Sequence, residues 1–177
     1  MAHLAVTKWY RDGVNAVFGV NPAEVIPDGF DPEQHQFAEL YIPAPIDVPI
    51  LTEDVFVKVD GTSNLDIKKG WSMPDDCRLQ YDGTGTRIVQ ILATLSMTLL
   101  GNGPNQIASV RLAVNGTTLA KTEVRRIVRN RPSPVPVQGM VEVSPGGFVE
   151  VWVTNNNSTR NLRVNSMSVL IFDLSEA

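Results

Sequence analysis

Few side chains in this sequence are of the kinds that carry out chemistry, and they lie far apart along the chain. The two histidines are His3 and His35, and the one cysteine is Cys77. His35 and Glu39 have the i, i+4 spacing of one helix face, but a metal site needs a further ligand that is not apparent. A cysteine–histidine nucleophile needs the two side chains in contact, and no local pattern indicates this. We therefore expect a solvated His35, no metal, no cofactor and no catalytic residue.

Other patterns that resemble catalytic motifs have simpler explanations. Asp75 and Asp76 are adjacent, and adjacent side chains of an extended chain point apart, so a turn is favoured over an acid pair. The glycine-containing segments 83–85 and 146–147 precede strands, and the first lacks the lysine and the helix of a phosphate-binding loop. A cupin-like enzyme needs several histidines on its strands, and residues 55–177 contain none.

Length and composition fit one folded domain with an additional segment. The 177 residues are 43% hydrophobic and 19% charged, which is ordinary for a globular protein and too apolar for a disordered one. A chain of this length buries a core without disulfides or metal ions. The first residues lack a signal-peptide pattern, and no apolar run reaches membrane-spanning length, so no membrane contact is expected.

Charge is unevenly distributed within a formal net charge of −4. Residues 1–76 contain five Lys and Arg against thirteen Asp and Glu, whereas residues 77–177 contain ten against six. This asymmetry suits contacts between copies or with another protein, and chance scatter of surface charge is the alternative. Because nucleic-acid binding needs clustered positive charge, we expect no nucleic-acid partner.

One basic cluster lies late in the chain. Its members are Arg125, Arg126, Arg129 and Arg131. No aromatic residue interrupts the cluster, so it lacks the stacking surfaces of a single-strand nucleic-acid site. The functional interpretation is docking onto an acidic neighbour, such as the acidic arm of another copy, and the alternative is a solvated strand and loop.

Residues 1–53 are predicted to form an arm of short helices and loops. Its prolines are Pro22, Pro27, Pro32, Pro43, Pro45 and Pro49. Proline removes a backbone donor and biases the preceding residue towards extended structure, so long helices and central strands are not expected between them. Short helices are predicted over Thr7–Phe18, which includes Trp9 and Tyr10, and from Asp31. We expect the arm either to lie over the surface of another molecule or to pack as ordered loops on its own domain.

Residues 54–177 are predicted to form an all-β domain. The clearest strand places Val89, Ile91, Ala93, Leu95, Met97 and Leu99 on one face, and this alternation indicates an apolar row on a core. Asn115-Gly116 is a hairpin signal because both residues tolerate positive φ. Thr117–Val128 is predicted as a further strand and residues 131–136 as a stiff connection. Seven or eight strands with regular turns and no helical crossover indicate an antiparallel sandwich or barrel.

Two aromatic residues share the outward face of one predicted strand. In residues 148–154, three valines alternate with Phe148, Glu150 and Trp152. If the valines face the core, both aromatics face outward, and large exposed aromatics indicate an interface. Cover by the arm or by a neighbouring loop is the alternative.

Several of these motifs resemble the tumour-necrosis-factor-like jelly roll of phage structural proteins. They are RLQYDG at 78–83, the strand at 88–100, LAVNGT at 112–117, VEVSPGG at 141–147 with VEVWVTN at 149–155, and SVLIF at 168–172. The resemblance covers roughly residues 70–175 and departs at Gly147, where an acidic residue is usual. It implies an antiparallel jelly-roll sandwich of about eight strands.

The resemblance also implies a function that is structural and not enzymatic. Such domains form tight trimers in which the last strand and a central strand line the threefold axis. The hypothesis is a homotrimeric capsid decoration (cement) protein on the virion surface, bound to the major capsid protein, since the long shaft of a fibre is not seen. The alternative is a tail-fibre or spike module that binds a receptor or carbohydrate through loops Gly101–Asn105 and Asn155–Asn161. The interface candidates are Trp9, Tyr10, Arg125, Arg126, Arg129, Arg131, Phe148, Trp152 and Phe172.

Overall fold

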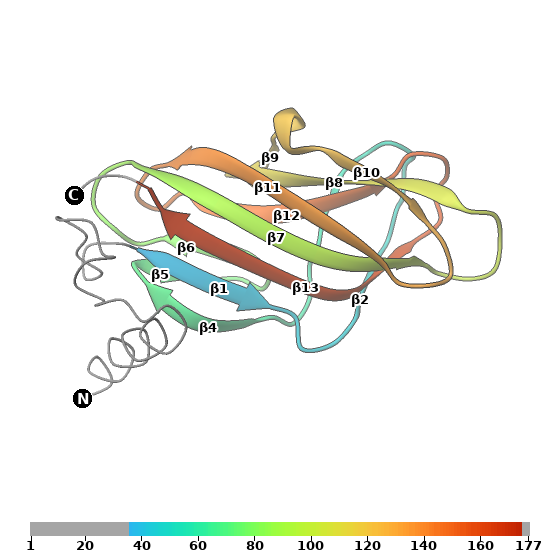
Figure 1. Ribbon diagram of the computed structural model, residues 1–177, viewed down its shortest axis with the longest axis horizontal. Helices are drawn as coiled ribbons and strands as arrows, with labels where there is room; N and C mark the ends of the chain where they lie inside the picture. Colours follow the sequence, from blue (N-terminus) through green and yellow to red (C-terminus); the bar gives the residue numbers. More distant parts are fainter. Residues whose placement is uncertain (1–35, 175–177) are drawn as a thin grey trace, which may run out of the picture. The chain divides into compact units, whose positions relative to one another are not determined.

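The computed structural model describes residues 36–174, whose strands form two packed antiparallel sheets (Figure 1). Sheet A contains, in order, β11 (Ser133–Val143), β7 (Arg87–Leu99), β13 (Leu162–Asp173), β1 (Phe37–Tyr41) and β4 (Asn64–Lys69), with β2 (Ile46–Val48) on β13. Sheet B contains β10 (Val124–Val128), β8 (Gln106–Val114), β12 (Phe148–Asn155), β6 (Arg78–Tyr81) and β5 (Trp71–Ser72), with β3 (Val57–Lys58) on β12 and β9 (Thr117–Thr118) on β8. The predicted all-β jelly-roll sandwich is confirmed.

The long strand β7 has the alternation that its sequence predicts. Its six inward residues, from Val89 to Leu99, are all buried. They pack in one core with inward residues of sheet B such as Leu112 and Val151. Each such buried aliphatic side chain stabilises the fold by about 1.5–3 kcal/mol. This core fixes which residues of sheet A face outward.

The sandwich begins earlier than the predicted boundary after residue 53. Strand β1 pairs with β13 from Phe37↔Phe172 to Tyr41↔Ser168, and β2 also pairs with β13. The expectation that proline excludes central strands here was wrong for β1, because that strand occupies a window without proline. Pro43 and Pro45 lie in the connection between β1 and β2, where no ladder hydrogen bond is needed.

Two predictions about the first residues have different outcomes. Glu39 lies on strand β1 and not on a helix, so the helix face assumed for the His35–Glu39 spacing is absent at Glu39. His35 itself lies outside the described residues. The predicted helices over Thr7–Phe18 and from Asp31 lie outside the described residues.

The hairpin at Asn115-Gly116 is confirmed, but the strand predicted after it is interrupted. Asn115 and Gly116 have φ of 51° and 74°, and they join β8 to β9. The predicted strand Thr117–Val128 divides into β9, a 3-10 turn η1 (Ala120–Thr122) and β10. The Thr122 hydroxyl donates to the Leu119 carbonyl at 2.8 Å and accepts from the Leu112 amide at 3.0 Å. This side chain replaces a backbone ladder bond, so the chain turns away from β8 there.

Candidate interaction surfaces

The outer face of sheet A carries apolar side chains that the strand register brings together. Gln90 on β7 pairs with Met140 on β11 and with Phe172 on β13, and Phe172 pairs with Phe37 on β1. In the next row, Leu92 pairs with Leu170. One row therefore crosses four strands with three large apolar side chains.

This face has an apolar end and a hydroxyl end. The apolar end, at the start of β7, consists of Phe37, Ile88, Leu92, Met140, Leu170 and Phe172. Met140 and Phe172 are 59% and 42% exposed. The hydroxyl end consists of Thr94, Ser96, Ser166 and Ser168, which follow along β7 and β13. Because soluble monomers rarely expose a contiguous apolar patch on a flat sheet, the apolar end has the character of an interface.

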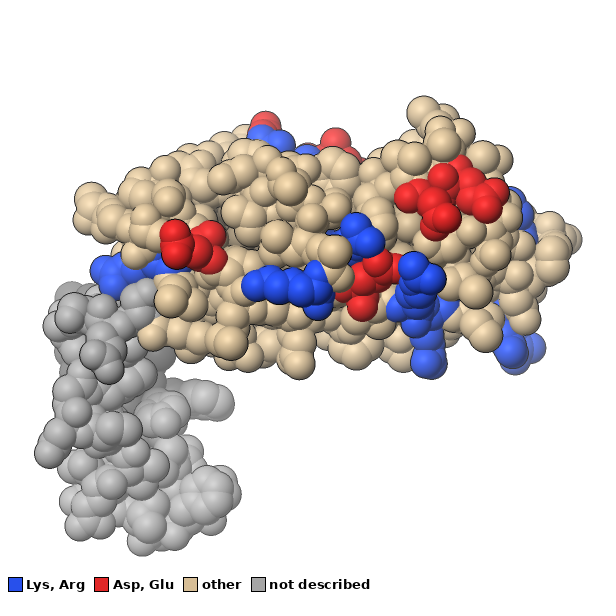
Figure 2. Space-filling model, turned by 90° about the horizontal axis from the view of Figure 1, so that it is seen from above, with Lys and Arg blue, Asp and Glu red and all other residues tan. Residues whose placement is uncertain are grey.

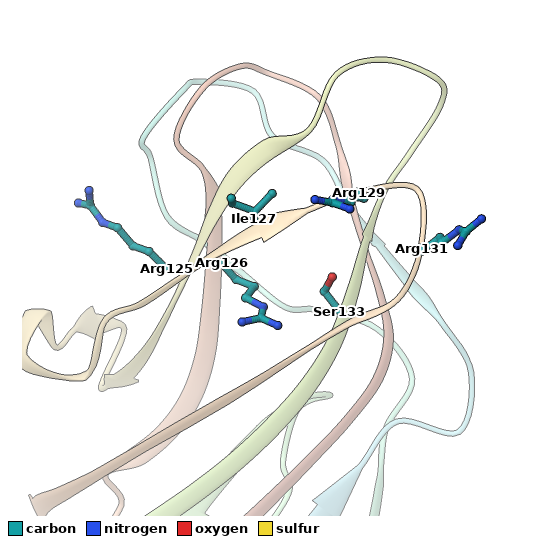
Figure 3. Close-up of a pocket in the computed structure, with 6 residues that line it drawn as sticks. All are labelled: Arg125, Arg126, Ile127, Arg129, Arg131 and Ser133. Atoms are coloured by element: carbon teal, nitrogen blue, oxygen red, sulfur yellow. The ribbon is translucent and has the colours of Figure 1, made fainter.

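The four predicted arginines do lie together, around an open hollow of about 560 Å³ that Ile127 and Ser133 also line (Figure 3). The hollow, here called the arginine hollow, lies where edge strand β10 of sheet B passes to edge strand β11 of sheet A. Figure 3 shows Arg126 and Arg129 beside Ile127, with Arg125 and Arg131 extended to either side. Ile127 is 56% exposed, so the lining of the hollow combines positively charged side chains with an accessible apolar one.

Next to the hollow, Glu123 is held by several hydrogen bonds. It accepts from Arg111 Nε at 3.0 Å, Arg125 Nε at 2.6 Å and the Ser109 hydroxyl at 3.0 Å. The bonds from Arg111 and Arg125 lower the pKa of Glu123 to about 2. Arg125 is therefore neutralised by Glu123, whereas the other arginines of the hollow form no ion pair with residues 36–174.

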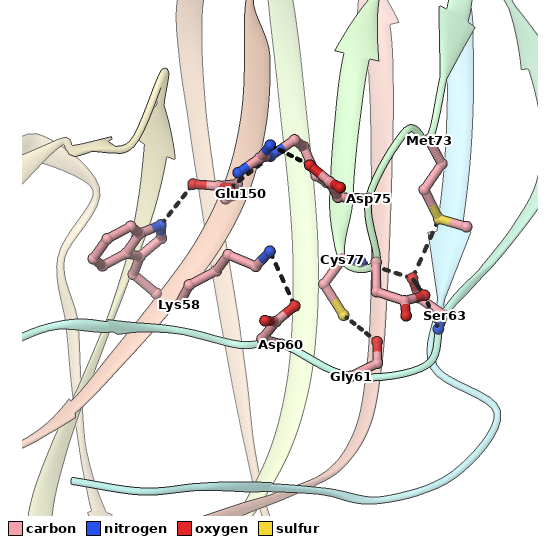
Figure 4. Close-up of polar contacts among 11 residues, drawn as sticks. Lys58, Asp60, Gly61, Ser63, Met73, Asp75, Cys77 and Glu150 are labelled. Atoms are coloured by element: carbon pink, nitrogen blue, oxygen red, sulfur yellow. Dashed lines mark hydrogen bonds and ion pairs between the residues drawn. The ribbon is translucent and has the colours of Figure 1, made fainter. Parts of the chain in front are cut away.

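On the outer face of sheet B, the chain itself covers the predicted aromatics. The guanidinium of Arg78 lies 4.2 Å from the ring centroid of Phe148. Glu150, which is buried, accepts from Arg78 Nε at 2.9 Å and from the Trp152 indole at 3.0 Å (Figure 4). Phe148 and Trp152 are consequently half-buried. This arrangement matches the alternative of local cover, and an interface role for them stays a prediction.

The lone cysteine occupies a structural position. Cys77 is buried with φ of 55°; its amide donates to the Ser63 hydroxyl at 2.7 Å and its thiol to the Gly61 carbonyl at 3.2 Å (Figure 4). Burial raises the pKa of the thiol. The two neighbouring aspartates separate: Asp75 pairs with Arg78, and Asp76 accepts from the Ser63 amide. These contacts hold a turn and do not assemble an acid pair.

The charged side chains visible in Figure 2 lie in small groups of both signs on a surface that is mostly uncharged. Within residues 36–174, no three His, Cys, Asp or Glu side chains are placed to hold a metal ion. That part of the chain also contains no helix with the length and hydrophobicity for crossing a membrane. The candidates Trp9 and Tyr10 lie outside the described residues.

No protein-family model matches the chain, and no curated protein matches its sequence. Solved structures with a similar arrangement of strands include PRD1 vertex protein P5, with 8% identity, a TM-score of 0.49 and coverage of 78% of this chain and 95% of that one. Murine APRIL at pH 5.0 has 14% identity and a TM-score of 0.48, covering 80% and 100%. The globular domain of zebrafish complement 1qA protein has 7% identity and a TM-score of 0.49, covering 81% and 100%. These likenesses carry no information on function.

Proposed function

We propose that the chain is a virion structural protein that forms a homotrimer and decorates a phage capsid. The observation that carries the proposal is the apolar end of sheet A, where three large side chains form one row across four strands. Strands β7 and β13 are adjacent in the middle of this sheet (Figure 1). The motif resemblance implies that a central strand and the last strand line the threefold axis, so the apolar end lies where a trimer contact is expected.

The virion location is supported by the strand and turn motifs that resemble phage structural proteins. A decoration protein stabilises a shell by adding buried area between subunits. In this proposal the sandwich forms the trimer, and the first part of the arm, which includes Trp9 and Tyr10, contacts the major capsid protein. Such a role needs interaction surfaces and no catalytic centre.

Two measurements test the proposal. Light scattering of the full chain should give about three times the chain mass of 19.4 kDa, and a single-chain mass at micromolar concentration would exclude the trimer. Electron microscopy of intact particles should place the protein on the shell. Density only on the tail would favour the second candidate.

The second candidate is a receptor- or carbohydrate-binding module, and one contact favours it. The guanidinium of Arg160 donates to the carbonyls of Gly101 at 2.7 Å and Pro104 at 2.9 Å. This side chain fixes loops 101–105 and 155–161 against each other, as a preformed binding site requires. Binding to a glycan array in the absence of capsids, lost in Arg160→Ala, would support this candidate.

A further inference from the structure

The arginine hollow carries positive charge that the described part of the chain does not balance. Arg125 pairs with Glu123, but no ion pair within residues 36–174 involves Arg126, Arg129 or Arg131. Three like charges around one hollow repel one another and attract an anionic partner. The hollow therefore fits a partner with several carboxylates.

The partner must also supply apolar side chains. Ile127 on β10 pairs with Ile107 on β8, and they are 56% and 39% exposed. A small inorganic anion would leave both in water. An acidic peptide with interspersed apolar residues would cover them while its carboxylates reach the guanidinium groups, which bind carboxylates with directional hydrogen bonds.

One segment of this chain has that composition. Residues 20–35 contain four carboxylates and no Lys or Arg. The acidic residues are Glu24, Asp28, Asp31 and Glu33, and Val25, Ile26 and Phe30 lie between or beside them. Three prolines in the segment reduce the backbone entropy that binding would remove.

A copy cannot dock this whole segment in its own hollow. The segment leads into β1 at Phe37, which lies in the same row as Gln90 at the start of β7. The hollow lies at the other end of that strand, where the Leu99 amide bonds to the Arg129 carbonyl. Nine residues of strand separate Gln90 from Leu99, a distance of about 30 Å. Fully extended, Asp31 reaches only about 21 Å from Phe37, so it cannot reach the hollow of its own copy.

We propose that residues 20–35 dock in the arginine hollow of a neighbouring copy and so link copies of the chain. The inference rests on the self-association proposed above. It names a segment of the chain that makes a further contact between copies, in addition to the apolar end of sheet A. Glu24, Asp28 and Asp31 pair with Arg126, Arg129 and Arg131, and Phe30 or Ile26 covers Ile127.

A disulfide experiment between two full-length variants tests this docking. One variant carries Gly29→Cys and a tag that changes its mass, and the other carries Ser133→Cys at the rim of the hollow. Cys77 is kept in both because it is 4% exposed. Mild oxidation of the mixture should give a linked product that contains one chain of each kind. Leu51→Cys, at a position that is 85% exposed, replaces Ser133→Cys in the matched control and should give only background.

Charge reversal tests the chemistry of the contact. Arg126→Glu/Arg129→Glu/Arg131→Glu on the Ser133→Cys chain should lower the yield about tenfold, as expected for three exposed pairs. Glu24→Lys/Asp28→Lys/Asp31→Lys on the other chain should restore it. Reversal of an exposed lysine elsewhere, Lys68→Glu, should leave the yield unchanged.

The outcomes separate this inference from the proposed function. If the full chain scatters as a trimer but the yield of the linked product equals the background of the Leu51→Cys control, the docking is overturned and the trimer stands. Linked chains that otherwise scatter as monomers support the docking and overturn the trimer. A yield unchanged by charge reversal also overturns the docking, because the arginines would then make no contact with the segment.

Discussion

The outward side chains of the two sheets have different surroundings. On sheet B, Phe148 and Trp152 are covered by Arg78 and bonded through Glu150. On sheet A, Met140 and Phe172 are 59% and 42% exposed. The polar cover of sheet B satisfies that face within one chain, whereas the described residues leave the apolar end of sheet A uncovered, as the proposed association needs. Aromatic residues that face outward therefore do not identify an interface by themselves. An interface is indicated only where neighbouring groups of the same chain leave them uncovered.

The largest expected effect follows from placing charge on the apolar end. Met140→Asp/Phe172→Asp should change the mass in light scattering from three chains to one, because buried unpaired carboxylates oppose association. Both positions are exposed within one chain, so the free energy of unfolding of the monomer should change by about 0.5 kcal/mol or less per substitution. The control Thr84→Asp/Thr117→Asp, at exposed positions outside sheet A, should remain trimeric. If the control also dissociated, the loss of the trimer could not be assigned to the apolar end of sheet A.

The buried carboxylate of sheet B should matter for stability and not for association. Glu150→Ala leaves the Arg78 Nε and the Trp152 indole without their acceptor, while Asp75 still pairs with the Arg78 guanidinium. The free energy of unfolding should fall by about 2–3 kcal/mol. Urea denaturation measures this loss, and Asp66→Ala, an exposed carboxylate on β4, serves as its control. The trimer mass should be unchanged. Dissociation of Glu150→Ala would indicate that sheet B also contributes to the interface.

Acid should weaken the ion pairs that Glu123 makes with Arg111 and Arg125 on sheet B. The pKa of Glu123 in the folded chain is about 2, against an ordinary value of 4.5. The stabilisation is therefore present above pH 4.5 and is lost as the pH falls from there towards 2. The full shift corresponds to about 3 kcal/mol, and solvent screening of the exposed Arg125 partner reduces this to about 2 kcal/mol. Urea denaturation at several pH values should show this loss in the parent. Glu123→Gln should be less stable near neutral pH and should lack this part of the pH dependence, and an identical pH profile in both would contradict the assignment.

The smallest effect should come from the ion pair between β13 and β2. Arg163 Nε donates to Asp47 at 2.6 Å, and this bond lowers the pKa of Asp47. Both side chains are exposed, so Arg163→Ala should lower the free energy of unfolding only slightly, and by less at about 1 M salt. A loss as large as that of Glu150→Ala would mean that exposure does not govern the difference between these ion pairs.

Local signals in the sequence predicted the fold well where local contacts determine it. The alternation of β7 and the Asn115-Gly116 hairpin are properties of neighbouring residues, and both are confirmed. The interruption after β9 depends on a bond from Thr122 to the strand before it, which no local pattern indicates. The segment 131–136, expected as a connection, belongs largely to β11, which begins at Ser133. Prolines are tolerated there because β11 is an edge strand.

The candidate surfaces differ in the same way. The arginines of the hollow are close in sequence, so their clustering could be predicted directly. The apolar end of sheet A combines residues from four strands, as far apart as Phe37 and Phe172, and only the register brings them into one row. Phe172 was identified as a candidate, but Met140, Ile88 and Leu92 were not. Their role depends on pairing that sequence patterns do not specify.

The pairing of β13 also determines the order of events during synthesis. Sheet A has β13 at its centre, bonded on its two sides to β7 and β1. Nascent chains emerge from the ribosome in order, so the two neighbours wait without their common partner until residues 162–173 are outside the tunnel. The surface proposed for association is assembled only in that last step. Until then the edges of β7 and β1 that β13 will cover stay unpaired, and such edges are the sites at which strands of other chains can add.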